Sequence, residues 1–466
     1  MKTLFITAYH GFIARNILNT DVLKILRANS DLRIIIFAPP SKKELFEKYY
    51  GGPNVIIEGF DLDPIIRTSK SKFWYRLAFL LENTQYVRDQ RAEYFYNNKT
   101  IFGFLNYQRL KISASILSSL PYSRTLYRWF NSVFAPGNIF EPFIKKYNPY
   151  VFFSTDIFGE QDVLFNREAH KNNIPLIGMV RSWDNTTTKG VLRVIPASIL
   201  SPSPKVKEEL IELHDCNAEQ IQVVGLPQFD TWLEGPTLSR EEFFAYIGAD
   251  PSKKLLLFAP AGSILSDTDW QLAQILRDAM DAGNLPDVQI LVRNHPHHPA
   301  DFSKFDNDPR FIFETPGVQL RSDDYKGAEI RPDEHDHLRN SVYYSEIVMY
   351  VATSLGLDAT VFDKPQILIS FDGWEKKPYV QSVKRYNQED CLASLVALGG
   401  TKVVYSADEW IAAINAYLKN PKLNQDGRHR TIGRHMYKLD GKAGKRIAQI
   451  ILNRLHLPFP RIGKFF

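Results

Sequence analysis

Residues 347–370 read IVMYVATSLGLDATVFDKPQILIS, and their pattern gives the clearest indication of the fold class. An apolar, β-branched run at 347–352 leads into a short helical pattern, which stops at Asp363-Lys364-Pro365 before a second apolar run. This order predicts one β-α-β unit. Strands that are apolar on both faces are typical of a parallel sheet covered by helices, so the stretch predicts an α/β fold.

The turn Thr353-Ser354-Leu355-Gly356 lies between the two predicted strands. Ligands of parallel sheets bind at the carboxyl ends of the strands. This turn supplies two hydroxyl groups, a glycine that permits close backbone approach and the free N–H groups of a helix start, which together suit a phosphate. The alternative is ordinary helix capping, with Asp358 in the first turn offsetting the helix dipole.

The same alternation of strands and helices occurs twice along the chain. A first series starts at Thr3 and, after an interruption, resumes at Tyr150, while a second series starts at Lys254. The 466 residues are too many for one ordinary core, which favours two domains of about 200 residues each. We expect a doubly wound domain at 1–230, a linker at 231–253, a second doubly wound domain at 254–430, and a C-terminal helix with a basic tail at 431–466.

Composition excludes several protein classes. Hydrophobic residues make up 44% of the chain and charged residues 23%, which fits neither a disordered chain nor a polytopic membrane protein. No apolar run approaches the length of a bilayer span, and the N-terminus lacks the features of a signal peptide. Cys216 and Cys391 are far apart, which disfavours a disulfide framework and a zinc site. We therefore expect a cytoplasmic protein.

Residues 64–150 interrupt the alternation with helical patterns that are dense in aromatic and basic residues, such as KSKFWYRLAFLL at 70–81 and YRWFNSVF at 127–134. Three interpretations are open: the core of a helical subdomain, a membrane interface with cations on anionic lipids, and stacking on single-stranded nucleic acid. No nucleic-acid motif supports the third. The net charge of +5 is concentrated here and in 428–466, which indicates an anionic partner surface.

Polar residues follow two predicted strands of the first domain. His10 lies where the first strand ends, either as a catalytic base or as a loop histidine without chemistry, and no GxGxxG motif indicates a dinucleotide site. A later strand ends in RSWDNTTTKG at 181–190, where Asp184 is a second candidate base or a turn cap. The candidate contacts of this cluster to an acceptor or a phosphate are Arg181, Asn185 and Lys189.

In the second domain, a strand at 288–292 ends in RNHPHHP at 293–299. Arg293 with one histidine suits a phosphate. A metal is disfavoured, because the prolines hold their neighbours extended, so that we expect the histidines to diverge, and because no carboxylate stands at ligand spacing.

The two α/β halves, one ending in SWDNTTTKG and the other carrying RNHPHHP followed by ATSLGLDATVFDKP, resemble the GT-B fold of nucleotide-sugar glycosyltransferases. More narrowly, they resemble bacterial surface-polysaccharide transferases and CDP-glycerol glycerophosphotransferases, to whose closing segment residues 395–452 are also similar. The resemblance implies two Rossmann-like domains facing across a cleft, with a helical insertion in the first and a C-terminal helix that returns to it.

The resemblance also implies roles. The first domain would hold the acceptor, with His10 or Asp184 as base, and the second a UDP- or CDP-linked donor, with no cofactor and no bound metal. The residues expected to bind the donor nucleotide and its diphosphate are Gly262, Ser263, Arg293, His295, Thr353, Ser354, Gly356 and Asp358.

We therefore expect a glycosyltransferase that moves a sugar from a nucleotide-diphosphate donor to a bacterial surface polysaccharide, such as a capsule, or to a lipid-linked glycan. It would attach peripherally to the anionic inner face of the membrane and bind no nucleic acid. The alternatives are a CDP-glycerol or CDP-polyol phosphotransferase of teichoic-acid-like polymers, a nucleotide-sugar 2-epimerase, and a non-catalytic membrane-surface glycan-binding protein. The epimerase is disfavoured because its glycine-arginine-proline start is absent after the first predicted strand.

Overall fold

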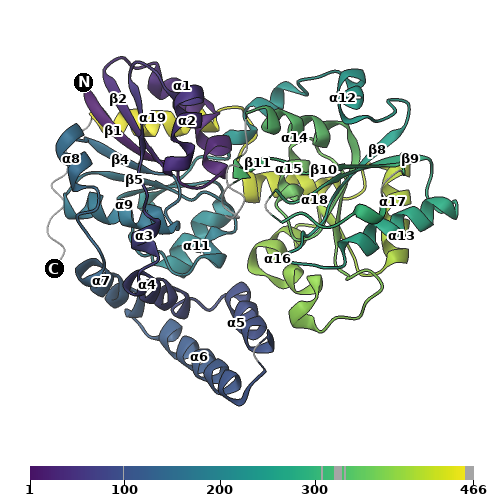
Figure 1. The fold of residues 1–466 in the computed structure, drawn as a ribbon, viewed down its shortest axis with the longest axis horizontal. Coiled ribbons are helices and arrows are strands. Elements are labelled where there is room, and N and C mark those ends of the chain that lie inside the picture. The colour runs from purple at the N-terminus through teal and green to yellow at the C-terminus, as the bar shows by residue number, and fades with distance from the viewer. Residues whose placement is uncertain (98, 297, 306–307, 320–327, 330–331, 457–466) are drawn as a thin grey trace. The chain divides into compact units, whose positions relative to one another are not determined.

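The computed structural model describes residues 1–97, 99–296, 298–305, 308–319, 328–329 and 332–456. The chain divides into two compact units. Unit 1 is Met1–Asp230 together with the C-terminal segment from Tyr437, and unit 2 is Thr231–Met436. Each unit is a parallel sheet with helices packed on it (Figure 1), which confirms the expected α/β class with two doubly wound sheets.

The sheet of unit 1 has seven parallel strands. In spatial order they are β3 (Val55–Gly59), β2 (Leu32–Ala38), β1 (Lys2–Thr7), β4 (Val151–Ser154), β5 (Leu176–Met179), β6 (Ser198–Ser201) and β7 (Ile221–Val223). The chain winds outward from β1 in one direction and from β4 in the other. The point where the strand order reverses therefore lies between β1 and β4.

Both faces of this sheet are buried, as the apolar strand sequences predict. Along β1, Leu4 and Ile6 belong to one hydrophobic cluster and Phe5, between them, belongs to the cluster on the opposite face. This alternation follows from the two-residue period of a strand. Outside residues 63–150, the helices of unit 1 are α1 (Asp21–Arg27), α2 (Lys43–Tyr50), α9 (Glu160–Lys171), α10 (Asn185–Thr188), α11 (Pro204–His214) and α19 (Ala443–His456).

The C-terminal helix α19 packs in unit 1, although all of unit 2 separates it from the rest of unit 1 in the sequence. Ile447 and Ile451 are fully buried in the cluster that contains Leu4 and Val22. The Asp230 carboxylate accepts hydrogen bonds from the N–H groups of Ala443, at 3.1 Å, and Gly444, at 2.7 Å, at the start of α19. A carboxylate at a helix N-terminus satisfies N–H groups that the helix itself leaves unpaired.

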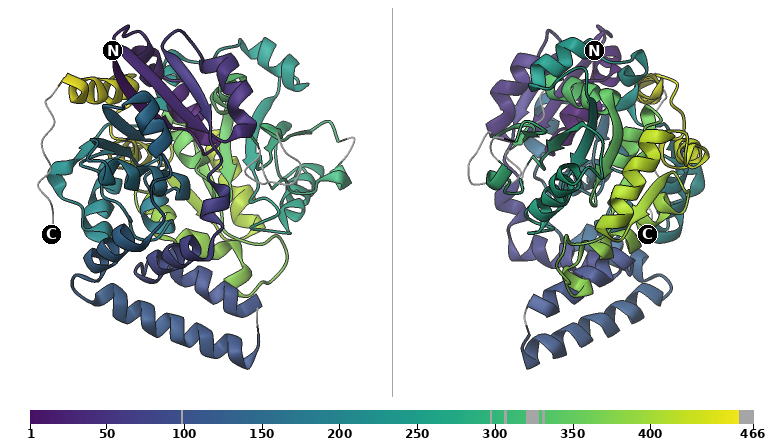
Figure 2. Two further views of the ribbon diagram at one scale, coloured as in Figure 1. Left: turned by 60° about the vertical axis from the view of Figure 1, so that its left-hand side comes forward. Right: turned by 90° about the vertical axis from the view of Figure 1, so that its right-hand side faces the viewer.

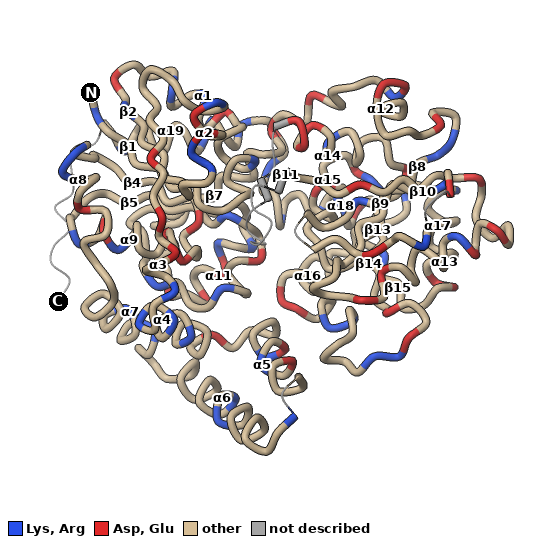
Figure 3. Tube along the Cα trace, in the orientation of Figure 1, with Lys and Arg blue, Asp and Glu red and all other residues tan. Residues whose placement is uncertain are grey.

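The aromatic and basic section folds into helices α3 (Asp63–Ile66), α4 (Ser69–Leu80), α5 (Gln85–Asn97), α6 (Ile101–Ser119), α7 (Ser123–Phe134) and α8 (Glu141–Tyr147). Its aromatic side chains divide into two groups. Trp74 and Tyr127 are buried in a small hydrophobic cluster of their own, whereas Phe73 and Trp129 are exposed. Helices α5 and α6 project away from the sheet of unit 1 (Figure 2), and α6 and α7 carry Lys and Arg but no Asp or Glu (Figure 3).

Within the described part of the chain, no helix is long and apolar enough to cross a membrane. The expected basic tail lies largely outside the described residues, because these end at His456. Arg461 and Lys464, which belong to the basic stretch 428–466 where we expected an anionic partner surface, are among the residues that are not described.

The sheet of unit 2 has six parallel strands. In spatial order they are β10 (Phe311–Glu314), β9 (Val288–Arg293), β8 (Lys254–Ala259), β13 (Ser345–Tyr350), β14 (Gln366–Ile369) and β15 (Thr401–Val404). A separate antiparallel pair is formed by β11 (Val318–Gln319) and β12 (Ala328–Glu329). The helices are α12 (Arg240–Ile247), α13 (Asp269–Asp281), α14 (Pro332–Tyr344), α15 (Leu355–Val361), α16 (Asp390–Val396), α17 (Ala407–Lys419) and α18 (Gln425–Thr431).

The stretch 231–253, which we expected to be a linker, contributes core side chains to unit 2. Trp232 is fully buried, its ring stacks on Phe362 with centroids 5.5 Å apart, and its indole N–H donates to His335 at 3.0 Å. Phe243 of α12 is also fully buried. The Gly235-Pro236 break that suggested a linker is a turn inside the unit, because large apolar side chains on both sides of it are buried.

Candidate functional site

In each sheet, the direction in which the chain adds strands reverses next to the first strand of that sheet. This reversal defines one pair of neighbouring strands in each unit. In unit 1 they are β1 and β4, and in unit 2 they are β8 and β13. Ligands of doubly wound sheets bind at the carboxyl ends of such strand pairs. These two edges are therefore where functional side chains are expected, and each is described separately below.

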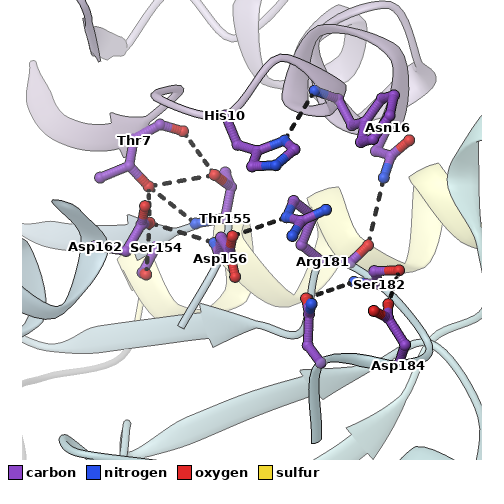
Figure 4. Close-up of polar contacts among 12 residues, drawn as sticks. Thr7, His10, Asn16, Ser154, Thr155, Asp156, Asp162, Arg181, Ser182 and Asp184 are labelled. Carbon is purple, nitrogen blue, oxygen red and sulfur yellow. Dashed lines mark hydrogen bonds and ion pairs between the residues drawn. The ribbon is translucent and has the colours of Figure 1, made fainter. Parts of the chain in front are cut away.

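At the β1–β4 edge, hydroxyl groups converge on one carboxylate (Figure 4). The Asp162 Oδ1 atom accepts hydrogen bonds from two hydroxyl groups. One is that of Thr7, at the end of β1, and the other is that of Ser154, at the end of β4, whose oxygen lies 2.9 Å from Oδ1. The Thr155 N–H donates to the Thr7 hydroxyl at 3.0 Å. This network ties the carboxyl ends of the two central strands together through α9, on which Asp162 lies.

Asp162 is fully enclosed, and its environment favours the protonated form. Burial is the main cause that raises the pKa of Asp162 to about 7, and the nearby negative charge of Asp156 raises it further. Hydrogen bonds from Thr7 and Ser154 oppose this rise, because they stabilise the charged form. The raised pKa brings the titration of Asp162 closer to neutral pH, the range in which acid–base catalysis operates.

Asp156, the second residue after β4, forms a buried ion pair. The Arg181 Nε atom donates to Asp156 Oδ2 at 2.8 Å, and both side chains are buried. Among the described residues, the other oxygen of this carboxylate, Oδ1, has no hydrogen-bond partner. An unsatisfied buried carboxylate oxygen is costly, and one at a ligand-binding edge is able to accept a hydrogen bond from a ligand hydroxyl or amide.

Arg181 is held in place from its backbone as well. The Asn16 side-chain amide donates to the Arg181 carbonyl oxygen at 3.4 Å. Asn185, fully buried at the start of α10, accepts a hydrogen bond from the Ser182 N–H at 3.1 Å, and within the described chain its own amide nitrogen has no partner. Asn185 and Asp156 thus offer one donor group and one acceptor oxygen at the same edge.

The two candidate bases chosen from sequence lie at this edge in different settings. His10 follows β1, and its Nδ1 atom accepts a hydrogen bond from the Phe12 N–H at 3.2 Å. The Asp184 carboxylate accepts hydrogen bonds from the hydroxyls of Ser182 and Thr188, the latter at 3.3 Å. Asp184 is therefore bound by its own turn, which is the capping alternative considered from the sequence. Lys189 is exposed at the end of α10.

Sequence reasoning missed Thr7, Asp156 and Asp162. A signal for them was present, since Ser154-Thr155-Asp156 is a polar run directly after the apolar run of β4. Such a run at a strand end is the same kind of signal that drew attention to 181–190.

In unit 2, the loop after β8 is organised by a buried carboxylate at the start of α13. Asp269 accepts hydrogen bonds from the N–H groups of Ala261, at 3.1 Å, and Gly262, at 2.8 Å. Burial raises the pKa of Asp269 to about 6, and these two N–H groups oppose the rise. Gly262 has a φ of +84°, which is accessible mainly to glycine, and the Ser263 N–H donates to the His298 carbonyl at 3.0 Å. The loops after β8 and β9 are therefore joined.

Arg293, at the end of β9, already has two carboxylate partners. It pairs with Glu314, the last residue of β10, and with Glu334 of α14 at 3.3 Å. Glu314 also binds His337, and its pKa is lowered by Arg293 and His337 although burial opposes that shift. Arg293 therefore binds a phosphate only if the phosphate replaces Glu314 or Glu334, or if the guanidinium group contacts the phosphate and these carboxylates at the same time.

The expectation that the histidines of 293–299 diverge is wrong for His295 and His298. Their ring centroids are 5.5 Å apart, and His295 Nδ1 accepts a hydrogen bond from the His298 N–H at 3.2 Å. The chain turns back between them instead of staying extended. His297 lies outside the described residues, and no group of three or more His, Cys, Asp or Glu side chains within those residues could hold a metal ion.

The turn after β13 presents Ser354 to solvent and uses Thr353 locally. The Thr353 hydroxyl accepts a hydrogen bond from the Leu355 N–H at 3.0 Å, whereas Ser354 is exposed. Ala352 directly before them has a φ of +45°, a left-handed conformation that is unfavourable for alanine. Strained backbone at the carboxyl end of a central strand is typical of ligand-binding turns.

Gly356 has a packing role that the sequence did not predict. A Cβ atom added at Gly356 would lie 2.8 Å from Cζ of Tyr350, a fully buried side chain whose hydroxyl is 3.2 Å from that of Thr401. The absence of a side chain at Gly356 is thus required by β13 beneath it. Asp358, in the same helix, is buried.

No protein-family model matches the sequence, and no curated protein sequence matches it. Solved structures do match. S. aureus MnaA, in a co-structure with UDP, has a TM-score of 0.56 at 13% identity over 99% of this chain and 98% of that chain. A putative UDP-N-acetylglucosamine 2-epimerase from Listeria monocytogenes has a TM-score of 0.56 at 12% identity over 97% of this chain and 96% of that chain.

The wall teichoic acid polymerase TagF is similar as well, with a TM-score of 0.52 at 12% identity over 97% of this chain and 89% of that chain. At these identities the likeness concerns the fold alone. The expected GT-B fold is therefore confirmed. The narrower grouping with CDP-glycerol glycerophosphotransferases stays a prediction.

Proposed function

We propose that this protein is a glycosyltransferase that moves a sugar from a nucleotide-diphosphate donor to a hydroxyl group of a bacterial surface glycan. The observation that carries the proposal is the Asp156 carboxylate, which is buried at the β1–β4 edge with one oxygen held by Arg181 and the other unpartnered among the described residues. A carboxylate so placed is suited to accept the proton of a substrate hydroxyl.

In this proposal unit 1 binds the acceptor. Asp156 Oδ1 accepts the proton of the acceptor hydroxyl while the oxygen of that hydroxyl attacks the anomeric carbon of the donor sugar. The bond from this carbon to the diphosphate breaks, which releases the nucleoside diphosphate. Arg181 keeps Asp156 oriented, Asn185 donates its free amide hydrogen to the acceptor, and Lys189 contacts an acidic acceptor group. His10 and Asp184 remain candidate bases, and replacing each of them tests the assignment to Asp156.

Unit 2 binds the UDP- or CDP-linked donor. The exposed Ser354 hydroxyl and the strained Ala352 backbone after β13 support a diphosphate contact, and the joined loops after β8 and β9 support a neighbouring one. Positively charged and N–H groups offset the charge of the leaving diphosphate without a bound metal. The donor contacts proposed in these loops are Gly262, Ser263, Arg293 and His295, and those after β13 are Thr353, Ser354, Gly356 and Asp358.

The acceptor is proposed to be lipid-linked, so that the protein works peripherally at the cytoplasmic face of the membrane. The support for this location is the aromatic and basic helical section of unit 1, which exposes apolar side chains on α6 and α7.

A nucleotide-sugar 2-epimerase is the second candidate. The closeness of Asp162 to Asp156 favours it: the Asp156 N–H donates to Asp162 Oδ1 at 3.3 Å, the Asp156 carboxylate is ion-paired, and burial raises the pKa of Asp162. An acid and a base side by side suit proton transfer at a sugar carbon. This reaction needs no acceptor, which separates it from the first candidate.

A product assay tests these proposals. The protein is first screened by thermal shift against UDP, CDP and GDP, since a ligand at 100 times its Kd adds about 2.7 kcal/mol to the free energy of unfolding. The sugar nucleotide that binds is then incubated with and without lipid-linked acceptor. Release of nucleoside diphosphate that depends on acceptor supports the transferase, and a 2-epimer formed without acceptor supports the epimerase. Release of CMP from CDP-glycerol supports the phosphotransferase.

Two variants connect the product assay to the structure. Asp156→Asn should lower turnover by about a hundredfold or more while nucleotide binding is retained. The control is Asp31→Asn, because Asp31 is an exposed aspartate of the same unit. Turnover of Asp156→Asn equal to that of the control would contradict the role of Asp156, and the His10 and Asp184 variants would then identify the base.

A further inference from the structure

Helix α7 is oriented with its polar side toward the protein. Arg128 donates to the Leu192 carbonyl oxygen at 2.9 Å and to the Asp215 carboxylate at 3.1 Å. Asn131 is buried and accepts a hydrogen bond from Arg167 at 2.6 Å. The inward face of α7 is therefore held by hydrogen bonds and ion pairs as well as by the buried Tyr127 ring, whereas the inward face of an ordinary surface helix is mainly apolar.

The outward face of α7 is apolar. Leu126, Trp129, Val133 and Phe134 are each at least half exposed. Leu126, Trp129 and Val133 are spaced three and four residues apart, which places them on one side of a helix. A soluble helix normally buries such a stripe, so this stripe is available to another apolar surface.

Helix α6, which contacts α7, has the same character over a greater length. Ala114 is its one buried residue. Ile101, Leu105, Ile112 and Ile116 are each more than half exposed, and their spacing of four, seven and four residues places them along one side. Together, the exposed apolar side chains of α6 and α7 form what we call the α6–α7 face.

The charged side chains of α6 and α7 themselves all have one sign, whereas the neighbouring helix α5 also carries Asp89 and Glu93. From Tyr94 to Phe140 the sequence contains no Asp and no Glu, whereas Lys99, Arg109 and Lys111 are exposed at or near α6 (Figure 3). Arg124 and Arg128 of α7 are instead paired with Asp215 and belong to the inward side. Exposed apolar side chains beside cations, in a stretch of sequence without carboxylates, match a surface that is apolar inside and anionic outside.

We propose that the α6–α7 face is the surface by which this protein attaches to an anionic lipid bilayer. A second copy of the chain is a poorer fit, because a two-fold contact would bring the same cations together with no carboxylate to offset them. The proposal rests on the membrane location proposed above and adds which surface of the protein makes the contact. It does not depend on the reaction, because vesicle binding is measured without donor or acceptor.

The experiment is flotation of the full chain with vesicles of phosphatidylcholine alone or mixed with phosphatidylglycerol, at low and high salt. The wild type should float with the mixed vesicles and float less at high salt, because salt screens the cations. Trp129→Ser/Val133→Ser and Ile112→Ser/Ile116→Ser should each lower the partition coefficient roughly tenfold or more. Arg109→Glu/Lys111→Glu should remove the preference for anionic lipid.

Matched controls replace side chains elsewhere that are also more than half exposed or carry exposed charges. Tyr246→Ser/Tyr405→Ser removes two exposed aromatic side chains of unit 2, and Lys419→Glu/Lys422→Glu reverses two exposed charges there. Both controls should bind vesicles like the wild type. Thermal unfolding should show the same midpoint for every variant, because all the replaced side chains are exposed.

Fluorescence gives a second readout of the same contact. Brominated lipid should quench the wild type, and Trp129→Phe should lose this quenching while it still floats, because the apolar contact is kept. Absence of flotation at low salt, or flotation that the two α6–α7 double variants retain in full, would overturn the proposal. A dimer that Trp129→Ser/Val133→Ser abolishes, without vesicle binding, would assign the face to a second copy and would likewise overturn it.

Discussion

Arg181 Nε donates a hydrogen bond to Asp156 Oδ2 over 2.8 Å, and the two buried side chains come from the ends of neighbouring strands β5 and β4. The ion pair uses one oxygen of the Asp156 carboxylate, and the other oxygen has no hydrogen-bond partner in the described chain. Burying two charges is costly, and a buried pair seldom adds net stability over apolar residues. Its position at the ligand-binding edge supports a functional reason for its presence.

The first prediction concerns the cost of breaking this pair. Asp156→Ala leaves Arg181 as a buried unpaired charge, and we expect a loss of roughly 3 to 5 kcal/mol in the free energy of unfolding by urea denaturation. The control is Asp63→Ala, which removes the exposed partner of Arg67 and should cost about 0.2 to 1 kcal/mol. Equal losses for the two variants would show that the Asp156–Arg181 pair is as hydrated as a surface pair.

The second prediction concerns pH. The pKa of Asp162 is about 7 in the folded protein, against an ordinary value of 3.8. Between these values the folded state binds more protons than the unfolded state, so the contribution of Asp162 to stability is present below about pH 4 and is lost as the pH rises to about 7. The loss should be roughly 1 to 4 kcal/mol.

Asp162→Asn removes the titrating group and should remove this decline. The measurement is the difference in unfolding free energy between wild type and Asp162→Asn from pH 4 to pH 8, which subtracts the titration of all other groups, such as the buried His214. The unfolding free energy of Asp162→Asn should increase relative to that of the wild type as the pH rises. A difference that stays constant across the range would mean that the carboxyl group of Asp162 is charged in the folded protein throughout.

The third prediction separates the packing role of Gly356 from ligand binding. Gly356→Ala forces the added methyl group against the buried Tyr350 ring and should cost about 1 to 3 kcal/mol in unfolding free energy. Gly433→Ala is the matched control, because nothing lies within 4 Å of its added Cβ. If Gly356→Ala were as stable as this control, Tyr350 would have room to move, and the packing of β13 would not require a glycine at this position.

The candidate site could be predicted from sequence only in part. Asn185 and Arg181 were found because they directly follow a strong apolar run, and such runs identify strand ends. The partner of Arg181 was not found, because Asp156 lies 25 residues earlier and only the neighbouring positions of β4 and β5 bring the two together. Likewise, Thr7 and Thr155 are 148 residues apart in the sequence, and their contact depends on β4 pairing with β1.

Local periodicity determined the fold class. Apolar runs such as 347–352 and the alternation of strands with amphipathic helices require a parallel sheet with both faces covered, whatever the details of packing. Packing between distant segments determined the rest: which side chain fills the space beside Gly356, which carboxylates pair with Arg293, and which face of α7 is turned inward. The physical reason is that hydrophobic patterning acts over neighbouring residues, whereas ion pairs and close contacts depend on strand order, which a single chain segment does not encode.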